Sequence, residues 1–297
     1  MSSSYSAESL FRVDGLVAIV TGGGSGLGRV IAHALATNGA QAVYILGRRE
    51  GALVETKQLC SAPDVIRPIV CDVTSKDALK AAADRVRGEL GYCDVVFANS
   101  GILGVDHARL MGKINQLDVK GIQEGLWEFD MQEFTETFHV NVTSKFYTVL
   151  AFLDLLDQGN KRAAAVTQKS QVILTSSIAG FARLPKAGFA YGSSKAAVTQ
   201  LSKQLTTLLA PHGIRVNTIA PGLYPSQMTE PDMNAAEGKD LRLEGNLDKA
   251  FVPLARMGTE EEFAGAILFL TSKAGGYIDG NVLVTDGGRL SIAPSTY

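Results

Sequence analysis

The sequence predicts an α/β fold in which helices cover both faces of one parallel β-sheet. Two observations predict it: short apolar, β-branched runs alternate with longer helical patterns along all 297 residues, and a glycine-rich string follows the first run. Such alternation is typical of consecutive βαβ units. No internal repeat or low-complexity linker interrupts it. We therefore expect one doubly wound domain over residues 1–297, with about seven strands in the order 3-2-1-4-5-6-7.

Four strands are expected in the first half, at residues 16–20, 42–46, 65–70 and 95–98. Helices are expected from the glycine string to about residue 38, and over 50–60 and 76–90. Asn38-Gly39 is a helix stop signal. Pro68 lies inside the third strand, where it cannot donate to a neighbouring strand. This proline indicates an edge strand, and the third strand is the edge in the order given above.

The second half continues the alternation with a long helix over 133–157 and a strand over 171–175. A helix over 189–209 stops at Pro211, and a strand over 215–219, a helix over 260–270 and a strand over 282–285 follow. Residues 102–131, 159–169 and 223–251 are predicted insertions. We expect 102–131 and 223–251 on the substrate side, the latter as a polar lid.

The composition excludes several classes of protein. A net charge of −2 with dispersed Lys and Arg gives no reason to expect a nucleic-acid partner. No apolar stretch approaches the ~20 residues of a membrane helix, and no basic segment precedes an apolar run as in a secretory signal. Cys60, Cys71 and Cys93 cannot all pair and lack metal-ligand spacing. We expect a cytoplasmic protein with reduced thiols and no metal.

The glycine-rich string is Thr21-Gly22-Gly23-Gly24-Ser25-Gly26-Leu27-Gly28, between the first strand and the first helix. Glycines permit a tight turn and let the backbone approach a pyrophosphate, and the helix N-terminus offers free N–H groups. This context predicts a dinucleotide site rather than a ligand-free loop. The expected contacts are Gly22, Ser25, Gly26, Leu27 and Gly28.

The end of the second strand indicates which dinucleotide binds. A site for NAD usually has Asp or Glu there, to accept from the ribose 2′-hydroxyl. This chain has Gly47, followed by Arg48 and Arg49. A guanidinium suits a 2′-phosphate, so Arg48 favours NADP(H). The alternative is a pair of solvated arginines at a helix start, which fits Arg49 better than Arg48.

Two further segments follow strands at the same expected edge of the sheet. Asp72 follows the third strand, where its carboxylate could accept from an adenine amino group, although a turn-forming Asp is nearly as consistent. We include the adjacent Val73 as a cofactor contact. Asn99-Ser100-Gly101 follows the fourth strand, at the carboxyl edge where open α/β sheets bind ligands.

Tyr191 and Lys195 are four residues apart, and hence on one face of the expected helix. A nearby cation lowers the pKa of a phenol from about 10, as general acid/base work near neutral pH requires. Taken alone, the pair is more often a surface pair. Ser177 follows the fifth strand fourteen positions before Tyr191, and Asn141 lies within the long helix. These residues make a catalytic interpretation stronger.

The whole set of motifs resembles that of the short-chain dehydrogenase/reductase family, from Gly22 to Gly288. The glycine motif matches at Thr21, Gly22, Gly26 and Gly28, and the family's Asn-Asn-Ala-Gly element appears with a change as Ala98-Asn99-Ser100-Gly101. The family's tetrad corresponds to Asn141, Ser177, Tyr191 and Lys195. Later motifs match at Pro221-Gly222, at Ser226 in place of a usual Thr that contacts the nicotinamide amide, and at Asp286-Gly287-Gly288.

The resemblance implies an NADP(H)-dependent oxidoreductase that interconverts a small-molecule ketone and a secondary alcohol. Tyr191 would protonate the oxygen, Ser177 orient the carbonyl, Lys195 hold the nicotinamide ribose and lower the Tyr191 pKa, and Asn141 position a water. Segments such as Arg256-Met257-Gly258-Thr259 resemble those of 3-oxoacyl-carrier-protein reductases and related ketoreductases. Such proteins are often homotetramers, so a homo-oligomer, tetramer or dimer, is expected.

Two alternatives stay open on the same fold. A lyase relative of the halohydrin dehalogenase type would have Arg in place of Lys195 and an altered glycine loop, whereas both match here. A non-catalytic NADP(H)-binding sensor or scaffold would typically lack Tyr191 or Lys195, and both are present. Cofactor turnover separates the enzyme from the sensor. The identity of the ketone does not follow from the fold.

Overall fold

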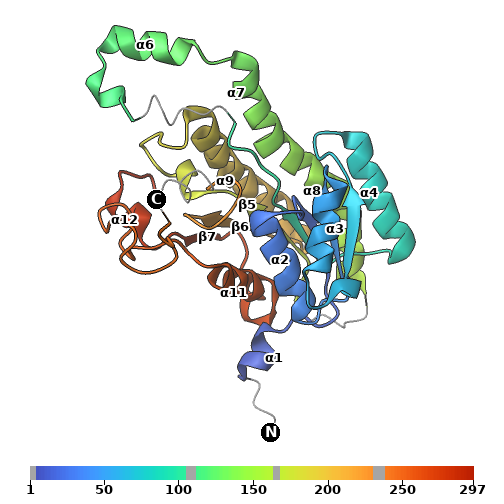
Figure 1. Cartoon of the computed structure of the whole chain (residues 1–297). Coiled ribbons are helices and arrows are strands. Elements are labelled where there is room, and N and C mark those ends of the chain that lie inside the picture. The colour runs from blue at the N-terminus through green and yellow to red at the C-terminus, as the bar shows by residue number, and fades with distance from the viewer. Residues whose placement is uncertain (1–4, 105–111, 163–167, 230–237) are drawn as a thin grey trace.

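The computed structural model describes residues 5–104, 112–162, 168–229 and 238–297. Seven parallel strands form one sheet in the order β3-β2-β1-β4-β5-β6-β7 (Figure 1). The predicted fold class and strand order are therefore confirmed. The strands are β1 (Val17–Thr21), β2 (Ala42–Gly47), β3 (Ile66–Val70), β4 (Val95–Ala98), β5 (Gln171–Thr175), β6 (Arg215–Pro221) and β7 (Val282–Thr285).

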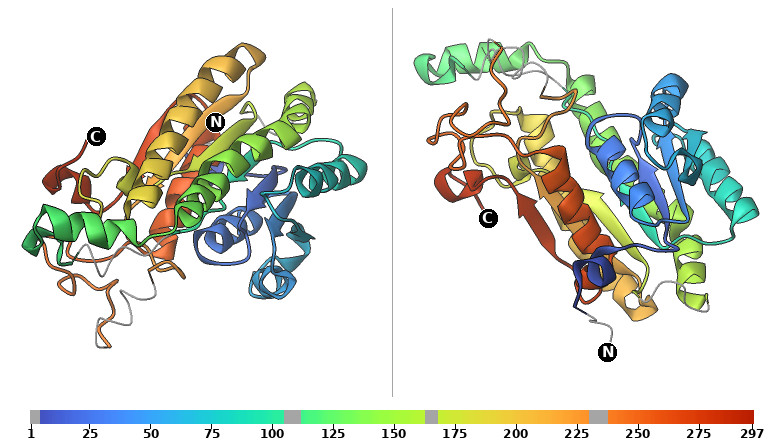
Figure 2. Two further views of the ribbon diagram at one scale, coloured as in Figure 1. Left: turned by 90° about the horizontal axis from the view of Figure 1, so that it is seen from above. Right: turned by 60° about the horizontal axis from the view of Figure 1, so that its bottom comes forward.

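Helices cover the sheet on both faces (Figure 2). Each face has its own apolar core. One core joins the sheet to α4 (Lys76–Glu89), α8 (Ser144–Lys161) and α9 (Phe189–Leu209). The other joins it to α2 (Gly26–Thr37), α3 (Glu50–Gln58) and α11 (Glu260–Thr271). β1 alternates between them, because successive side chains of a strand point to opposite faces. A central strand with both faces covered is largely apolar, and in β1 the first four residues are apolar and all five are buried.

The edge position of β3 confirms the interpretation of Pro68. Within the sheet β3 pairs with β2 alone, and Pro68 lies opposite Ile45 in that register. The missing N–H of Pro68 thus removes no hydrogen bond from the interior of the sheet. Its carbonyl accepts from the Arg85 guanidinium at 3.0 Å.

The expected long helix 133–157 is longer and is interrupted. α7 (Met131–Phe138) leads into a π-helical turn, His139–Thr143, and α8 continues from Ser144. Such a turn adds a residue to the helix and is frequent at functional sites. Ser144 Oγ, on the first residue of α8, donates back to Val140 O in the turn at 2.6 Å. The turn contains Asn141, which its packing buries completely.

The expected insertions fall partly outside the described residues. Within 102–131 lies α6 (Val119–Trp127), which extends away from the sheet layers (Figures 1 and 2). Residues 105–111 of that insertion, 163–167 of the second and 230–237 of the expected lid lie outside the described part. Two short helices, α1 (Ala7–Phe11) and α12 (Arg289–Ile292), were not predicted. No helix in the described ranges is long and apolar enough to span a bilayer.

Candidate active site

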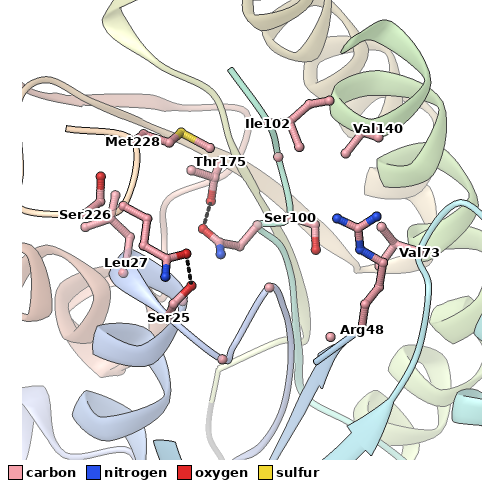
Figure 3. Close-up of a pocket in the computed structure, with 18 of the residues that line it drawn as sticks. Ser25, Leu27, Arg48, Val73, Ser100, Ile102, Val140, Thr175, Ser226 and Met228 are labelled. Carbon is pink, nitrogen blue, oxygen red and sulfur yellow. Dashed lines mark hydrogen bonds between the residues drawn. The ribbon is translucent and has the colours of Figure 1, made fainter. Parts of the chain in front are cut away.

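A cavity of about 740 Å³ lies at the carboxyl ends of the strands. Every predicted cofactor residue lines it, together with Ser177, Tyr191 and Lys195. Asn141 does not line the cavity; it lies buried behind the wall. Figure 3 shows Arg48 and Val73 on one side of the pocket, opposite Leu27 and Ser226. The sequence-predicted residues are thus brought to one place, although they come from distant segments.

The glycine loop forms one wall, and its conformation requires glycine at several positions. Gly22 and Gly26 have φ values of +70° and +50°, in the left-handed region. A Cβ on Gly28 would lie 2.1 Å from Gly22 O, so this glycine permits close contact between α2 and the loop. Ser25, the residue before α2, makes no capping hydrogen bond. The first N–H groups of α2 are thus left without a side-chain cap at the cavity, an arrangement that fits an anionic pyrophosphate.

The two arginines after β2 differ in their contacts. Arg49 donates to Oε1 of Gln227, which also lines the pocket, at 3.1 Å. Arg48 is exposed at the pocket wall and forms no hydrogen bond or ion pair with any described residue. Its charge contributes to a lowered pKa of Asp72, after the hydrogen bonds from Thr74. Arg48 is therefore the arginine whose guanidinium is not already engaged by a described residue and can turn all its donors to a ligand phosphate.

The Asp72 carboxylate closes a turn with Thr74, two residues along the chain. Its Oδ1 accepts from Thr74 N at 2.9 Å and from Thr74 Oγ1 at 2.7 Å. This is the turn-forming arrangement that the sequence left open beside the adenine contact. Asp72 and Val73 both line the cavity, so a contact with a nucleotide stays a prediction.

The turn after β4 is held from both neighbouring strands. Thr21 Oγ1 accepts from the backbone N–H groups of Asn99 and Ser100, at 2.9 and 3.1 Å. The Asn99 side chain donates to Thr21 O at 3.1 Å and accepts from Thr175 Oγ1 at 3.1 Å. With its polar groups paired in this way, the turn presents a fixed surface to the cavity.

Pro221, Gly222 and Ser226 line the cavity beyond β6. Gly222 N donates to Thr285 O at 2.8 Å, and a Cβ on Gly222 would lie 2.7 Å from the Cα of Asp286. Gly222 therefore allows close packing against the segment after β7. Ser226 N donates to Thr229 Oγ1 at 2.9 Å, which fixes the start of the expected lid.

Tyr191 and Ser177 approach one another at the pocket from different elements. Ser177 follows β5 and its hydroxyl accepts from Ala179 N at 3.1 Å, whereas Tyr191 lies in the first turn of α9. Burial raises the pKa of Tyr191, and a hydrogen bond with Ser177 opposes this shift. The expected lowering of the Tyr191 pKa is therefore not found. The cause is that loss of water around the phenol outweighs the groups that favour the phenolate.

Lys195 lies one turn after Tyr191 and is almost completely buried. Its Nζ lies 5.3 Å from the centroid of the Tyr191 ring and donates to Thr175 O at 3.2 Å. Burial lowers the pKa of Lys195 to about 8. The ammonium group thus loses its proton more readily than an ordinary lysine, since water does not stabilise its charge.

Asn141 connects the π-helical turn to the chain after β4 and to α9. Its Oδ1 accepts from Ile102 N at 2.8 Å, and its Nδ2 donates to Ile102 O at 2.9 Å. The same Nδ2 donates to Ser194 Oγ at 3.0 Å. A buried amide with its hydrogen-bonding capacity used in this way holds surrounding segments at fixed positions.

A family model for short chain dehydrogenases matches residues 16–237, three quarters of the chain and most of the site. The chain belongs to the short-chain dehydrogenase/reductase family. Members are oxidoreductases of alcohol and carbonyl groups that use a nicotinamide cofactor. The uncapped start of α2, the glycine wall and the paired turn after β4 fit such a cofactor.

Relatives in the family span the whole chain. Short-chain dehydrogenase/reductase PhomF of Diaporthe leptostromiformis is 44% identical over 301 residues, covering 100% of both chains. A rhamnolipids biosynthesis 3-oxoacyl-[acyl-carrier-protein] reductase of Pseudomonas aeruginosa is 34% identical, covering 94% of this chain and 97% of its own. Among solved structures, the Pseudomonas aeruginosa RhlG/NADP active-site complex has a TM-score of 0.78 at 31% identity, covering 94% and 98%.

Several residues at this short-chain dehydrogenase/reductase site were not among the predicted contacts, although Gly24, Gly47 and Arg49 lie in segments that the sequence analysis used. The cavity is also lined by Gly24, Gly47, Arg49, Ala52, Leu53, Cys71, Thr74, Ile102, Val140, Thr175, Ser176, Tyr224, Gln227, Met228 and Thr229. Ile102, Gln227 and Met228 belong to the segments expected on the substrate side. Cys71 and Thr74 flank the predicted Asp72–Val73 pair, so a wider window after β3 would have included them. A second buried lysine, Lys145, lies behind the wall and was also missed.

Proposed function

We propose that this protein is an NADP(H)-dependent ketoreductase that interconverts a ketone and a secondary alcohol, with Tyr191 as the general acid/base. The observation that carries the proposal is the joint position of Tyr191, Ser177 and Lys195 on the wall of a cavity that also contains the glycine loop. We include residues 1–297 in one oxidoreductase domain, with 102–131 and 223–251 on the substrate side. A homo-oligomeric state and a cytoplasmic location stay predictions.

The preference for NADP(H) rests on Arg48. The exposed Arg48 guanidinium at the pocket wall can donate to a 2′-phosphate, whereas Arg49 is engaged with Gln227. Gly47 lacks the carboxylate that would accept from the 2′-hydroxyl of NAD. Support also comes from the similar Pseudomonas aeruginosa structure, which is an RhlG/NADP complex.

The reaction divides between cofactor and protein. When bound, the nicotinamide supplies the hydride that reduces the carbonyl carbon. Ser177 donates a hydrogen bond to the carbonyl oxygen and orients it, and Tyr191 transfers its proton to that oxygen. A raised Tyr191 pKa suits this direction, because the phenol is then protonated at neutral pH.

The proton that Tyr191 gives up is replaced from within the site. Lys195, with its pKa lowered to about 8, can carry a proton near neutral pH, and its charge stabilises the phenolate once formed. Asn141 would position the water that returns protons to Lys195 indirectly, because its side-chain amide lies behind the cavity wall and is engaged by Ile102 and Ser194. The water-poor environment of both groups strengthens these interactions.

The test is a screen of ketones that follows the absorbance of NADPH, with NADH in parallel. We expect turnover with NADPH for the wild type and a loss of about 100-fold or more in Tyr191→Phe, with NADPH binding retained. Tyr92→Phe is the matched control, because Tyr92 bonds Gln41 outside the cavity. NADPH binding without oxidation of any ketone would favour the sensor, and conversion of a substrate without cofactor oxidation would favour the lyase.

A further inference from the structure

Lys145 is fully buried on α8, one turn after Asn141. Its Nζ donates to Ala98 O at 2.5 Å and to Ser100 O at 2.8 Å. Ala98 is the last residue of β4, and Ser100 belongs to the turn after it that lines the cavity. Burying a lysine costs free energy unless its amino group is well paired. The two carbonyl partners of Lys145 meet this requirement, and they tie its side chain to one place in the chain.

α8 and the π-helical turn before it hold this segment with two side chains. Asn141 binds both backbone groups of Ile102, and Lys145 binds the carbonyls of Ala98 and Ser100. From the other side, Thr21 binds the N–H groups of Asn99 and Ser100. The backbone from Ala98 to Ile102 is thus fixed between β1 and α8.

The same segment touches the reacting end of the site. A Cβ placed on Gly101 would lie 3.0 Å from Asn141 Oδ1 and 3.4 Å from Lys195 Nζ. A shift of the turn in the direction of that Cβ would therefore press on Lys195 and on Asn141. The charges of the two lysines also interact: burial and then repulsion by Lys195 lower the pKa of Lys145.

We propose that Lys145 is a positioning residue of the hydride-transfer reaction, which fixes the Ala98–Ile102 segment against Lys195 and Asn141. The proposal rests on the proposed function. Lys145 acts from behind the wall, through the backbone carbonyls of Ala98 and Ser100. Its loss should thus disturb the reacting end of the site more than the Arg48 end. At the reacting end, a displacement of about 1 Å costs up to about 100-fold in rate.

The experiment compares Lys145→Met with Lys145→Gln in the full-length protein. Met fills the space but cannot donate, whereas the Gln amide keeps a neutral donor toward the same carbonyls. We expect Lys145→Met to lower kcat by about tenfold or more, with the Kd for NADPH, from fluorescence titration, within about threefold of wild type. Lys145→Gln should recover part of kcat.

A second readout does not need turnover. Hydrogen exchange followed by mass spectrometry reports on the amides of Asn99, Ser100 and Ile102, which are hydrogen-bonded in this segment. We expect faster exchange there in Lys145→Met than in the wild type. This readout tests Lys145 even if the wild type turns over no ketone, an outcome that would remove the proposed function instead.

Phe152→Leu is the matched control, since Phe152 is buried in the core on α8 and does not line the cavity. It should lower Tm with kcat nearly unchanged and with normal exchange at residues 99–102. The proposal would be overturned by a folded Lys145→Met with wild-type kcat and exchange, by a kcat loss in Lys145→Met that Phe152→Leu shows equally at the same loss of Tm, or by a Lys145→Gln no better than Lys145→Met. Loss of NADPH affinity as large as the loss of kcat would also overturn it.

Discussion

Asn141 and Ser194 join the two helical segments of the site through one buried hydrogen bond, from Nδ2 to Oγ, of 3.0 Å. Ser194 in turn donates to the carbonyl of Tyr191 at 2.7 Å. A chain of hydrogen bonds thus runs from Ile102 through the π-helical turn to the backbone of the candidate acid. Asn141 and Ser194 are buried, so their side chains depend on these partners for their hydrogen bonds.

Ser194→Ala should therefore affect both stability and rate. One hydrogen of Asn141 Nδ2 keeps Ile102 O as a partner, and the other loses its acceptor, at a cost of about 1–3 kcal/mol in the free energy of unfolding. We expect kcat to fall by about tenfold, because the position of Tyr191 is less constrained. Urea unfolding and steady-state kinetics measure the two effects.

Ser202→Ala is the control for this prediction. Ser202 is buried on the same helix and donates to Thr199 O at 2.7 Å, outside the cavity. It should lose about 1 kcal/mol or less in stability and keep its kcat. Equal kcat in both variants would show that the bond from Asn141 to Ser194 does not position Tyr191.

Gly28→Ala should disrupt the cofactor wall. The added Cβ would lie 2.1 Å from Gly22 O and 2.8 Å from Asn99 Nδ2, so backbone must move. We expect a loss of about 3 kcal/mol or more in stability and loss of NADPH binding, measured by thermal unfolding and fluorescence titration.

Gly265→Ala provides the comparison on α11. No atom lies within 4 Å of the Cβ it would add, and the residue is exposed. Because Ala favours a helix interior, this variant should gain about 0.5–1 kcal/mol. If Gly28→Ala were as stable as Gly265→Ala, the inference that α2 packs closely on the glycine loop would be wrong.

The fold was predictable because its signals are local. Strand periodicity, the Asn38-Gly39 stop and Pro68 each depend on a few adjacent residues. The alternation of strands and helices indicated the doubly wound order that the sheet has, and Pro68 agrees with it on the edge strand. The glycine loop and the residues after each strand share one edge by the geometry of parallel sheets, so the residues of the cavity followed.

The features that were missed depend on contacts between distant segments. The π-helical turn contains Asn141, which hydrogen-bonds Ile102, 39 residues away, and nothing in the helical pattern predicts this turn. Lys145 looks like an ordinary helical lysine until its carbonyl partners, 45 and 47 residues away, are known. The direction of the Tyr191 pKa likewise depends on burial, which the spacing from Lys195 does not report.

Arg48→Glu should weaken the preference for NADPH over NADH by at least about tenfold. A carboxylate at this position repels the 2′-phosphate and can accept from the 2′-hydroxyl, and one lost charge-assisted bond is worth about 1.5–3 kcal/mol. The measurement is kcat/KM with each cofactor. Arg87→Glu is the control, because Arg87 lies on the exposed face of α4 and pairs with Asp84. Unchanged selectivity in Arg48→Glu would mean that Arg48 does not bind the 2′-phosphate.

Lys195 should make the stability of the cofactor-free protein depend on pH. Its pKa is lowered to about 8 in the folded state from 10.5, so between these values the unfolded chain binds more protons than the folded one. The free energy of unfolding therefore rises with pH across this window, by up to about 3 kcal/mol from Lys195. Below about pH 8 both states hold the proton and this pH dependence is lost.

Lys195→Met should remove that rise, so the stability of the wild type relative to the variant should increase from pH 8 to 10. Lys145 changes the comparison in the same direction. In Lys195→Met the repulsion from Lys195 is gone, so the pKa of Lys145 is lowered less, and the free energy of unfolding of the variant rises less with pH on account of Lys145. Urea unfolding at several pH values measures the difference, with Lys203→Met, an exposed lysine of α9, as the control. Parallel pH curves for wild type and Lys195→Met would mean that Lys195 is solvated rather than buried beside Tyr191.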